Sequence, residues 1–194
     1  MQIEKVTLDG SSVRLEPLAL AHLASLAAAI LDGELWQIPV TIVPHPDDLP
    51  AFLADAERAF QEQRELSFAT IDKRTGKVVG STRFRNIERG HLRAEIGFTF
   101  LAASFQRSHV NTEAKYLMLR HAFEVWRLNR VELLTDLLNE KSRRAIGRIG
   151  ARQEGVLRSH MVMRDGRIRD SVMFSMVASE WPDAERALAG KLAL

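Results

Sequence analysis

The chain has no cysteine, and this absence excludes several kinds of chemistry. Disulfide bonds, thiolate metal sites and a cysteine nucleophile are all ruled out. No apolar run reaches the roughly 18 uncharged residues of a membrane-spanning helix. The longest candidate, residues 15–31, is interrupted by Glu16, Pro17 and His22. Residues 1–5 lack the basic and apolar segments of a signal peptide. We therefore expect a soluble, cytoplasmic protein without membrane contact.

The sequence also lacks internal repeats, linkers and low-complexity tracts. Its 194 residues, 46% of them hydrophobic, suffice for one sizeable core. The spacing of apolar residues predicts a single α/β domain over residues 1–194. Strands are expected over residues 12–16, 66–71, 77–85, 92–101, 130–138, 156–164 and 167–177, and helices over residues 19–31, 48–63, 112–126 and 140–150. The proline-rich stretch 36–50 is expected to be irregular, which is typical of a flap over a site.

Residues 105–115, with the sequence FQRSHVNTEAK, join a predicted strand to a predicted helix. A strand followed by a loop and a helix start leaves backbone N–H groups without acceptors in the chain. These groups and the positive end of the helix dipole form a ready site for a phosphate or pyrophosphate. The loop therefore predicts an anion-binding site.

Charge is unevenly distributed, although the net charge is only +2. Between residues 141 and 169 there are nine basic residues and two acidic ones. Most are arginines, whose guanidinium group can donate two parallel hydrogen bonds to a phosphate. A solvated face that keeps the protein soluble explains the same pattern equally well.

Several short stretches, taken in order, resemble the GNAT acetyltransferases and in particular their RimJ/RimL-like branch. They are AEIGF at 94–98, NTEAK at 111–115, Asp136 with NEKS at 139–142, IGA at 149–151 and EGVLR at 154–158. The resemblance extends from residue 13 to residue 182. It implies an α/β (α+β) fold, with a mixed, mostly antiparallel central sheet flanked by helices and with central strands that splay apart. It also implies acetyl-CoA as co-substrate, no metal, and an amine acceptor that is either a protein N-terminus or a small molecule.

The same resemblance implies where the cofactor lies. The pantetheine arm is expected between the strands that contain Glu95 and Thr135, paired with free backbone groups of residues 98–101. The pyrophosphate is expected on the N–H groups of residues 106–111. The residues implied in cofactor binding are Phe98, Phe100, Leu101, Gln106, Arg107, Ser108, His109, Val110, Asn111, Asn139 and Ser142.

The phosphate loop departs from the family pattern at His109 and Asn111, where glycines are usual. Glycine tolerates positive φ and lets the backbone approach a phosphate, and asparagine visits the left-handed region more readily than histidine. Because a pyrophosphate needs N–H donors rather than glycine itself, we expect binding with altered loop geometry. A carboxylate at Glu113 would repel a phosphate that it faced, so its side chain is expected to point away.

Acetyl transfer needs a neutral amine, a donor for the oxyanion and a proton for the departing thiolate. Without cysteine, direct attack in a ternary complex is expected, with a main-chain N–H near Phe100 or Leu101 as the oxyanion donor. Glu95 is the favoured general base, directly or through a water, because apolar neighbours would raise its pKa. The alternative is that Glu95 faces solvent or pairs with an arginine such as Arg93. Glu154 is the second candidate for the base.

Ser142 is the expected general acid or hydrogen-bond donor to the sulfur, since the RimL-like branch resembles this chain in having serine where many GNAT enzymes have tyrosine. The alternative is an ordinary residue of the first helical turn that satisfies a free N–H. Asn139 is expected either to cap that helix or to bind a cofactor amide. Tyr116 is expected to pack in a buried helix, and Trp36 either lines the acceptor site or packs in the core.

Two other functions remain open at this point. One is a ribosome-associated or RNA-binding module that uses the basic stretch 141–169, although nucleic acid is disfavoured because no aromatic residues interleave with the basic ones there. The other is a non-catalytic acyl-CoA sensor, which the altered loop and the weakly acidic serine allow. The histidines lack the spacing of a metal site. Apolar residues at 161–177 predict a contact either in a homodimer or in the core.

Overall fold

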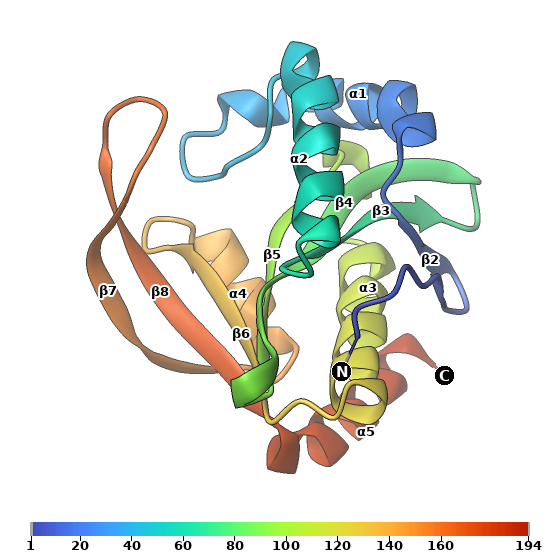
Figure 1. Cartoon of the computed structure of the whole chain (residues 1–194), viewed down its shortest axis with the longest axis vertical. Coiled ribbons are helices and arrows are strands. Elements are labelled where there is room, and N and C mark those ends of the chain that lie inside the picture. The colour runs from blue at the N-terminus through green and yellow to red at the C-terminus, as the bar shows by residue number, and fades with distance from the viewer. Residues whose placement is uncertain (1, 194) are drawn as a thin grey trace.

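The computed structural model describes residues 2–193, in which eight strands form one sheet in the order β1-β2-β3-β4-β5-β6-β8-β7. Neighbouring strands are antiparallel except β5 and β6, which are parallel. Helices surround the sheet, and the β7–β8 hairpin curves away from α3 and α5 (Figure 1). The predicted mixed, mostly antiparallel sheet flanked by helices is confirmed.

The elements have the following bounds. The strands are β1 (Leu8–Asp9), β2 (Val13–Pro17), β3 (Leu66–Asp72), β4 (Lys77–Glu88), β5 (Arg93–Leu101), β6 (Arg130–Asp136), β7 (Arg152–Val162) and β8 (Ile168–Val177). The helices are α1 (Leu23–Leu31), α2 (Leu49–Gln61), α3 (His109–Arg120), α4 (Glu140–Arg148) and α5 (Trp181–Leu192). No helix in this part of the chain is both long enough and apolar enough to cross a bilayer.

Two apolar cores cover the two faces of the sheet. Successive strand residues point to opposite faces, so the neighbours Phe68 and Ala69 of β3 belong to different cores. Phe68 packs in the core that contains residues of α3 and α5, and Ala69 packs in the core that contains residues of α1 and α2. All of β3 is buried, as expected for a strand covered on both sides.

The central strands separate as the resemblance implies. β5 and β6 pair only over three residues each, from Arg93↔Arg130 to Glu95↔Glu132. Beyond this point β5 continues to Leu101 along β4, while β6 continues to Asp136 along β8. The edge of β5 that faces β6 is therefore unpaired beyond Glu95, and this gap positions the site described below.

Helix α3 begins earlier than the sequence predicts. It starts at His109 rather than at residue 112, because the hydroxyl of Ser108 accepts the N–H of Val110 at 3.3 Å and caps the helix. It ends at Arg120 and is followed by a π-helical turn, His121–Val125. Apolar spacing does not distinguish such a turn from a continuing α-helix, so the predicted end at residue 126 was too late.

The C-terminal part of the chain also differs from the prediction in two respects. Helix α5 was not expected, and it packs through Trp181, whose ring stacks on Phe123 at 5.7 Å and whose Nε1 donates to Glu124 at 2.9 Å. Strand β7 begins at Arg152, four residues before the predicted start at residue 156. The predicted turn at Asp165 and Gly166 is present, with Gly166 at φ 80°.

Candidate active site

A cavity of about 1080 Å³ lies where β5 and β6 separate. Its walls come from residues 95–101 of β5, residues 132–136 of β6, the start of α3 and helix α4. The segment at residues 35–43 and the β7–β8 hairpin close it on the other side. The cavity thus connects the two faces of the sheet through the gap between the splayed strands.

The wall formed by β5 is bent by a bulge. Phe98 has φ 46°, and the pairing of β5 with β4 shifts register between Ser81 and Arg83. A bulge leaves backbone groups unpaired and re-aims the neighbouring side chains. The ring of Phe98 lies between the guanidinium groups of Arg83 and Arg85, each 4.7 Å from the ring centre. These contacts hold the bulge in place at the edge of the cavity.

The start of α3, where the sequence predicts an anion site, lies at the cavity. Gln106, Arg107, Ser108 and Asn111 line the cavity. The first N–H groups of a helix have no acceptor within the helix, and here they lie beside the cavity. Val110 does not line the cavity, because its side chain is fully buried in the core.

The loop geometry explains how His109 and Asn111 replace the glycines that are usual at their positions. Both residues lie in the first turn of α3, where φ is negative, so neither needs the freedom of glycine. Positive φ occurs instead at Arg107, at 59°. The His109 ring also does not line the cavity; its Nε2 lies 3.2 Å from Asp72 Oδ1 and joins α3 to β3.

Glu113 points away from the anion site, as expected. It is completely buried, and its carboxylate accepts the backbone N–H of Ser12 at 3.0 Å and the hydroxyls of Ser11 and Ser12 at 3.0 and 2.6 Å. Burial would raise the pKa of Glu113, but the hydrogen bonds from the serines outweigh it and lower the pKa. Glu113 thus anchors the β1–β2 turn to α3.

Glu95 lies in the cavity wall and is only 6% exposed. Burial raises the pKa of Glu95, and this effect exceeds the opposite effects of Arg85, 3.8 Å from Oε1, and of Asn86, which donates to Oε2 at 2.8 Å. The alternative of a solvent-facing Glu95 is wrong, whereas the alternative of a pairing with an arginine is met by Arg85 in place of Arg93. Arg93 pairs instead with Glu88 and Glu132.

Ser142 and Asn139 line the cavity at the start of α4. Asn139 caps the helix, since its Oδ1 accepts the N–H of Ser142 at 3.0 Å. Among residues 2–193 the Ser142 hydroxyl has no hydrogen-bond partner, so it does not satisfy a free N–H of the helix. The hydroxyl is therefore available to a ligand in the cavity.

Comparison with known proteins identifies the family. A model of the acetyltransferase (GNAT) domain matches residues 12–152. This chain belongs to the GNAT acetyltransferase family.

Individual GNAT relatives agree with this assignment. The chain is 33% identical over 106 residues to a Bacillus subtilis (strain 168) protein named "Putative ribosomal N-acetyltransferase YdaF", a match that covers 55% of this chain and 57% of the relative. A GCN5-related N-acetyltransferase structure from Brucella melitensis is 32% identical, with a TM-score of 0.87 over 98% of this chain and 86% of that chain. Mycobacterium smegmatis RimJ, in complex with CoA-disulfide, shares the fold at 24% identity, with a TM-score of 0.81 over 92% of this chain and 88% of that chain. These relatives are consistent with the RimJ/RimL-like branch, and the chain spans little more than half the length of YdaF.

Within this GNAT domain, the second candidate base lies outside the cavity. Glu154 is on β7, where Arg130 donates to both carboxylate oxygens and the Ser175 hydroxyl donates at 2.7 Å. These hydrogen bonds lower the pKa of Glu154 to about 2. A carboxylate held so firmly in its ionised form is a weak proton acceptor near neutral pH.

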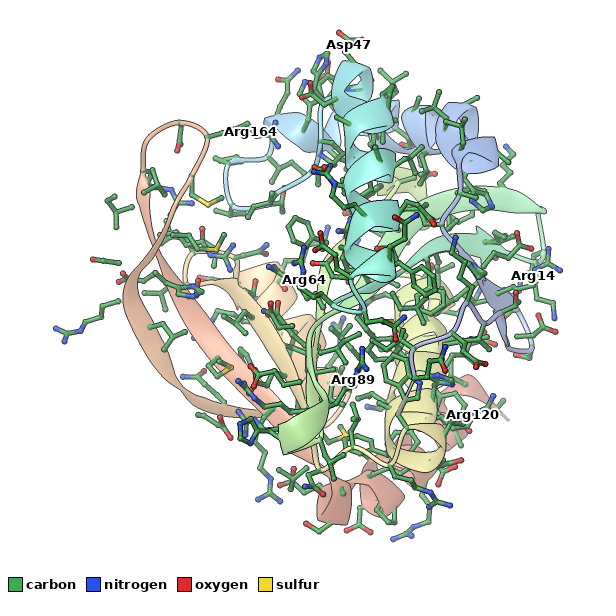
Figure 2. The ribbon with its side chains drawn as sticks, in the orientation of Figure 1. Arg14, Asp47, Arg64, Arg89, Arg120 and Arg164 are labelled. Carbon is green, nitrogen blue, oxygen red and sulfur yellow. The ribbon has the colours of Figure 1, made fainter. Side chains whose placement is uncertain are left out.

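The proline-rich segment covers part of the cavity, as a flap over a site would. Its backbone is held by the hairpin and α4: Arg164 donates to the carbonyl of Val43, Arg167 to that of Pro39 at 3.2 Å, and Asn139 to that of Val40 at 3.5 Å. Figure 2 shows Arg164 between the tip of the hairpin and this segment. Trp36 does not line the cavity; it packs on the core and against His45 at 5.3 Å.

Sequence reasoning missed Lys115 as a cavity residue. Lys115 is 5% exposed, and its Nζ donates to Thr82 at 2.9 Å and to Thr99 at 2.6 Å. Burial lowers its pKa to about 7, and no charged group among the described residues contributes to the shift. A lysine within a helix that is otherwise apolar on nearly every face was the available signal, because such a lysine cannot reach solvent easily. Tyr116, the next residue, packs as predicted, 6.1 Å from Trp181.

Sequence reasoning also missed Arg169 and His160. Both line the cavity, and both contact the hydroxyl of Ser171, Arg169 through Nε at 2.9 Å and His160 through Nδ1 at 3.0 Å. Alternation along β8 places Arg169 and Ser171 on one face of the sheet, but only the twist of the hairpin turns that face toward the cavity. No group of three or more metal-ligating side chains occurs among residues 2–193.

Proposed function

We propose that this GNAT domain transfers an acetyl group from acetyl-CoA to a primary amine, either a protein N-terminus or a small molecule, by direct attack in a ternary complex. The observation that carries the proposal is the cavity between β5 and β6. Both the start of α3, whose N–H groups suit a phosphate, and the buried carboxylate of Glu95 line this cavity.

The described residues fit acetyl-CoA. The N–H groups at the start of α3 and the Arg107 side chain would hold the pyrophosphate, and Arg107 and Ser108 already line the cavity. The unpaired edge of β5 from Phe98 to Leu101 would pair with the amides of the pantetheine arm. Acetyl-CoA supplies the acetyl group as an activated thioester.

Glu95 is the proposed general base. Its raised pKa suits a group that takes a proton from the acceptor ammonium near neutral pH, directly or through a water. The neutral amine then attacks the thioester carbonyl, so that a carbon–nitrogen bond forms and the carbon–sulfur bond breaks. A main-chain N–H near Phe100 or Leu101, on the unpaired edge beyond the bulge, stabilises the oxyanion.

Ser142 is the proposed hydrogen-bond donor to the departing sulfur. Its hydroxyl lines the cavity and has no partner among residues 2–193. A serine hydroxyl is a poor acid, so its role is to stabilise the thiolate, and the final proton comes from the medium.

The rival functions have less support. Several residues of the basic stretch are engaged within the chain: Arg152 pairs with Glu180 at 2.9 Å, Arg167 with Asp136 at 2.5 Å, and Arg164 with a backbone carbonyl. Part of the basic stretch is therefore already engaged within the chain, which weakens the case for an RNA-binding surface. A non-catalytic sensor would bind CoA without releasing its thiol in the presence of any amine, which the experiment below distinguishes.

The test begins with calorimetric titration of acetyl-CoA and CoA into the wild type, Asn111→Asp and Asn129→Asp. Asn111 lines the cavity, and Asn129 is exposed elsewhere, so the second variant adds the same charge away from the site. We expect tight binding to the wild type and the control, and a loss of at least tenfold in Asn111→Asp, because a carboxylate would repel the pyrophosphate. Absence of binding to the wild type would refute the proposal.

Turnover is then measured with a panel of amines and a thiol reagent that detects released CoA. The protein contributes no background, because it has no cysteine. Ser142→Ala is expected to slow turnover about tenfold without changing the affinity for CoA. CoA binding without thiol release for any amine would favour the sensor.

A further inference from the structure

Among residues 2–193, the cavity wall formed by β8 contains a buried cation, Arg169, that has no ion-pair partner. Arg169 is 6% exposed, and its Nε is bound by the hydroxyl of Ser171. Among residues 2–193 no carboxylate lies within ion-pair distance of Arg169, and its two terminal nitrogens have no hydrogen-bond partner. These nitrogens are not sealed from solvent, in contrast to Nη2 of Arg83, so they open on the cavity that Arg169 lines.

The neighbouring acidic groups are committed to other partners. Both oxygens of Asp136 are used, one by Arg167 at 2.5 Å and the other by the N–H of Leu138 at 2.9 Å. Glu132, which lies four residues before Asp136 on β6, forms ion pairs with Arg93 and Arg130. A guanidinium group needs an anion to offset the cost of its burial, and residues 2–193 provide none in contact with Arg169.

Arg169 and Glu95 lie on the same face of the sheet. Glu95 of β5 is paired with Glu132 of β6, and Asp136, four residues after Glu132, is paired with Ser171 of β8. Paired residues, and residues an even number of positions apart on one strand, point to the same face of the sheet. Arg169 is two residues from Ser171 and therefore shares the face. Burial lowers the pKa of Arg169, while the charges of Asp136 and, to a smaller extent, Glu95 raise it, so both carboxylates lie near the guanidinium group. Glu95, the proposed base, and the guanidinium group of Arg169 thus face the same cavity.

The hydroxyl of Ser171 fixes the orientation of the guanidinium. It accepts from Arg169 Nε at 2.9 Å and can donate its own proton to Nδ1 of His160 at 3.0 Å. The terminal nitrogens are left as a planar fork, the geometry that binds a carboxylate through two parallel hydrogen bonds. Apolar residues 35, 38, 40, 42 and 43 line the same cavity.

We infer that the acceptor is a small amine that also carries a carboxylate, and that this carboxylate binds the terminal nitrogens of Arg169 while the amine faces Glu95. The inference rests on the proposed function and narrows its acceptor to an amino-acid-like molecule with an apolar body. Arg169 is then the residue that determines acceptor specificity.

The experiment compares each of several amino acids with the amine that lacks its carboxylate: leucine with 3-methylbutylamine, phenylalanine with 2-phenylethylamine, and 6-aminohexanoate with hexylamine. The measured quantity is the ratio of kcat/KM within each pair, determined by release of CoA. We expect the wild type to prefer at least one carboxylate-bearing member by about tenfold to a hundredfold, the strength of a charged hydrogen bond.

The variants are Arg169→Met, Arg169→Lys and the control Arg158→Met, which removes an exposed arginine from the same hairpin. Arg169→Met is expected to abolish the preference, Arg169→Lys to keep part of it, and Arg158→Met to keep all of it. A ratio within one variant is insensitive to partial misfolding, and acetyl-CoA affinity reports separately whether the cofactor site is intact.

The possible failures are distinguishable. If acetyl-CoA does not bind to the wild type, the proposed function itself fails. If the cofactor binds and amines without a carboxylate or peptide N-termini are acetylated as well as their carboxylate-bearing counterparts, only the inference about Arg169 is overturned. A preference for the carboxylate that survives in Arg169→Met would also overturn it.

Discussion

Replacing Lys115 by methionine is expected to stabilise the protein near neutral pH. Lys115 is 5% exposed and has two threonine hydroxyls but no carboxylate as partners. Burial of a cation without a counterion favours the neutral form, and the pKa of Lys115 falls from 10.5 to about 7. Methionine has a similar length and shape and carries no charge.

The size of the effect follows from the two pKa values. The difference between 10.5 and about 7 corresponds to a cost of about 5 kcal/mol in the free energy of folding at pH values below 7. Methionine also loses the hydrogen bonds to Thr82 and Thr99, each worth about 1 kcal/mol. The net gain is therefore about 3 kcal/mol, or roughly 6–12 °C in Tm for a chain of this size.

The sign of the pH dependence is fixed by the direction of the shift. Between pH 7 and 10.5 the unfolded chain binds a proton at Lys115 that the folded chain does not, so the cost decreases as pH rises. The advantage of Lys115→Met is expected to be fully present at pH 6 and to vanish near pH 9, where the cost of burial has fallen to about the 2 kcal/mol of the lost hydrogen bonds. By pH 10 the variant is expected to be slightly less stable than the wild type.

Thermal and urea unfolding of the wild type, Lys115→Met and the control Lys77→Met between pH 6 and 10 measure this difference. Lys77 is exposed, so its substitution is expected to leave stability unchanged across the range. A Lys115→Met variant that is less stable than wild type at pH 6, or a difference that does not vary with pH, would refute the reasoning from burial.

Three further predictions concern other buried groups. Glu95→Gln is expected to lower kcat about a hundredfold and to remove the acidic limb of the pH–rate profile. Burial raises the pKa of Glu95, so the activity of the wild type should increase as pH rises through that pKa. An acidic limb that persists in the variant would exclude Glu95 as the base. Glu113→Gln is expected to lower the free energy of unfolding, measured in urea, by about 2 kcal/mol at pH 7. Because the pKa of Glu113 is lowered in the folded protein, this loss of stability should shrink as pH falls through that pKa. An equal loss at pH 3 would contradict the role of the ionised carboxylate. Gly80→Ala is expected to disrupt β4 and β5, since a Cβ there would lie 2.0 Å from the carbonyl oxygen of Phe100. Gly90→Ala is the control, because a Cβ there would meet no atom within 4 Å. A Gly80→Ala variant with wild-type stability and activity would contradict the close packing.

Much of the fold could be predicted from the sequence, because the local patterns are strong. Alternation in β3 to β5, the helical spacing of α1 and α2, and the Asp165–Gly166 turn act over a few residues and agree with the fold. The start of α3 was misplaced by three residues, because the cap that sets it is the single hydroxyl of Ser108. Helix α5 was missed because the contact that holds it, between Trp181 and Glu124 of the π turn, joins residues 57 positions apart in the sequence.

The candidate site, like the fold, was predicted in part from the sequence and decided in part by the tertiary structure. The sequence alone determined the order of strand, loop and helix around residues 105–115, the absence of a cysteine nucleophile, and Glu95 and Ser142 as the candidates for the chemistry. Only the tertiary structure decided that β5 and β6 separate after Glu95, that Lys115 is buried beside the gap, and that Arg169 faces it without an ion-pair partner among residues 2–193. The reason is physical: spacing along the chain fixes local hydrogen bonds and faces, whereas burial and the charge of a group depend on strands that approach it from distant parts of the sequence.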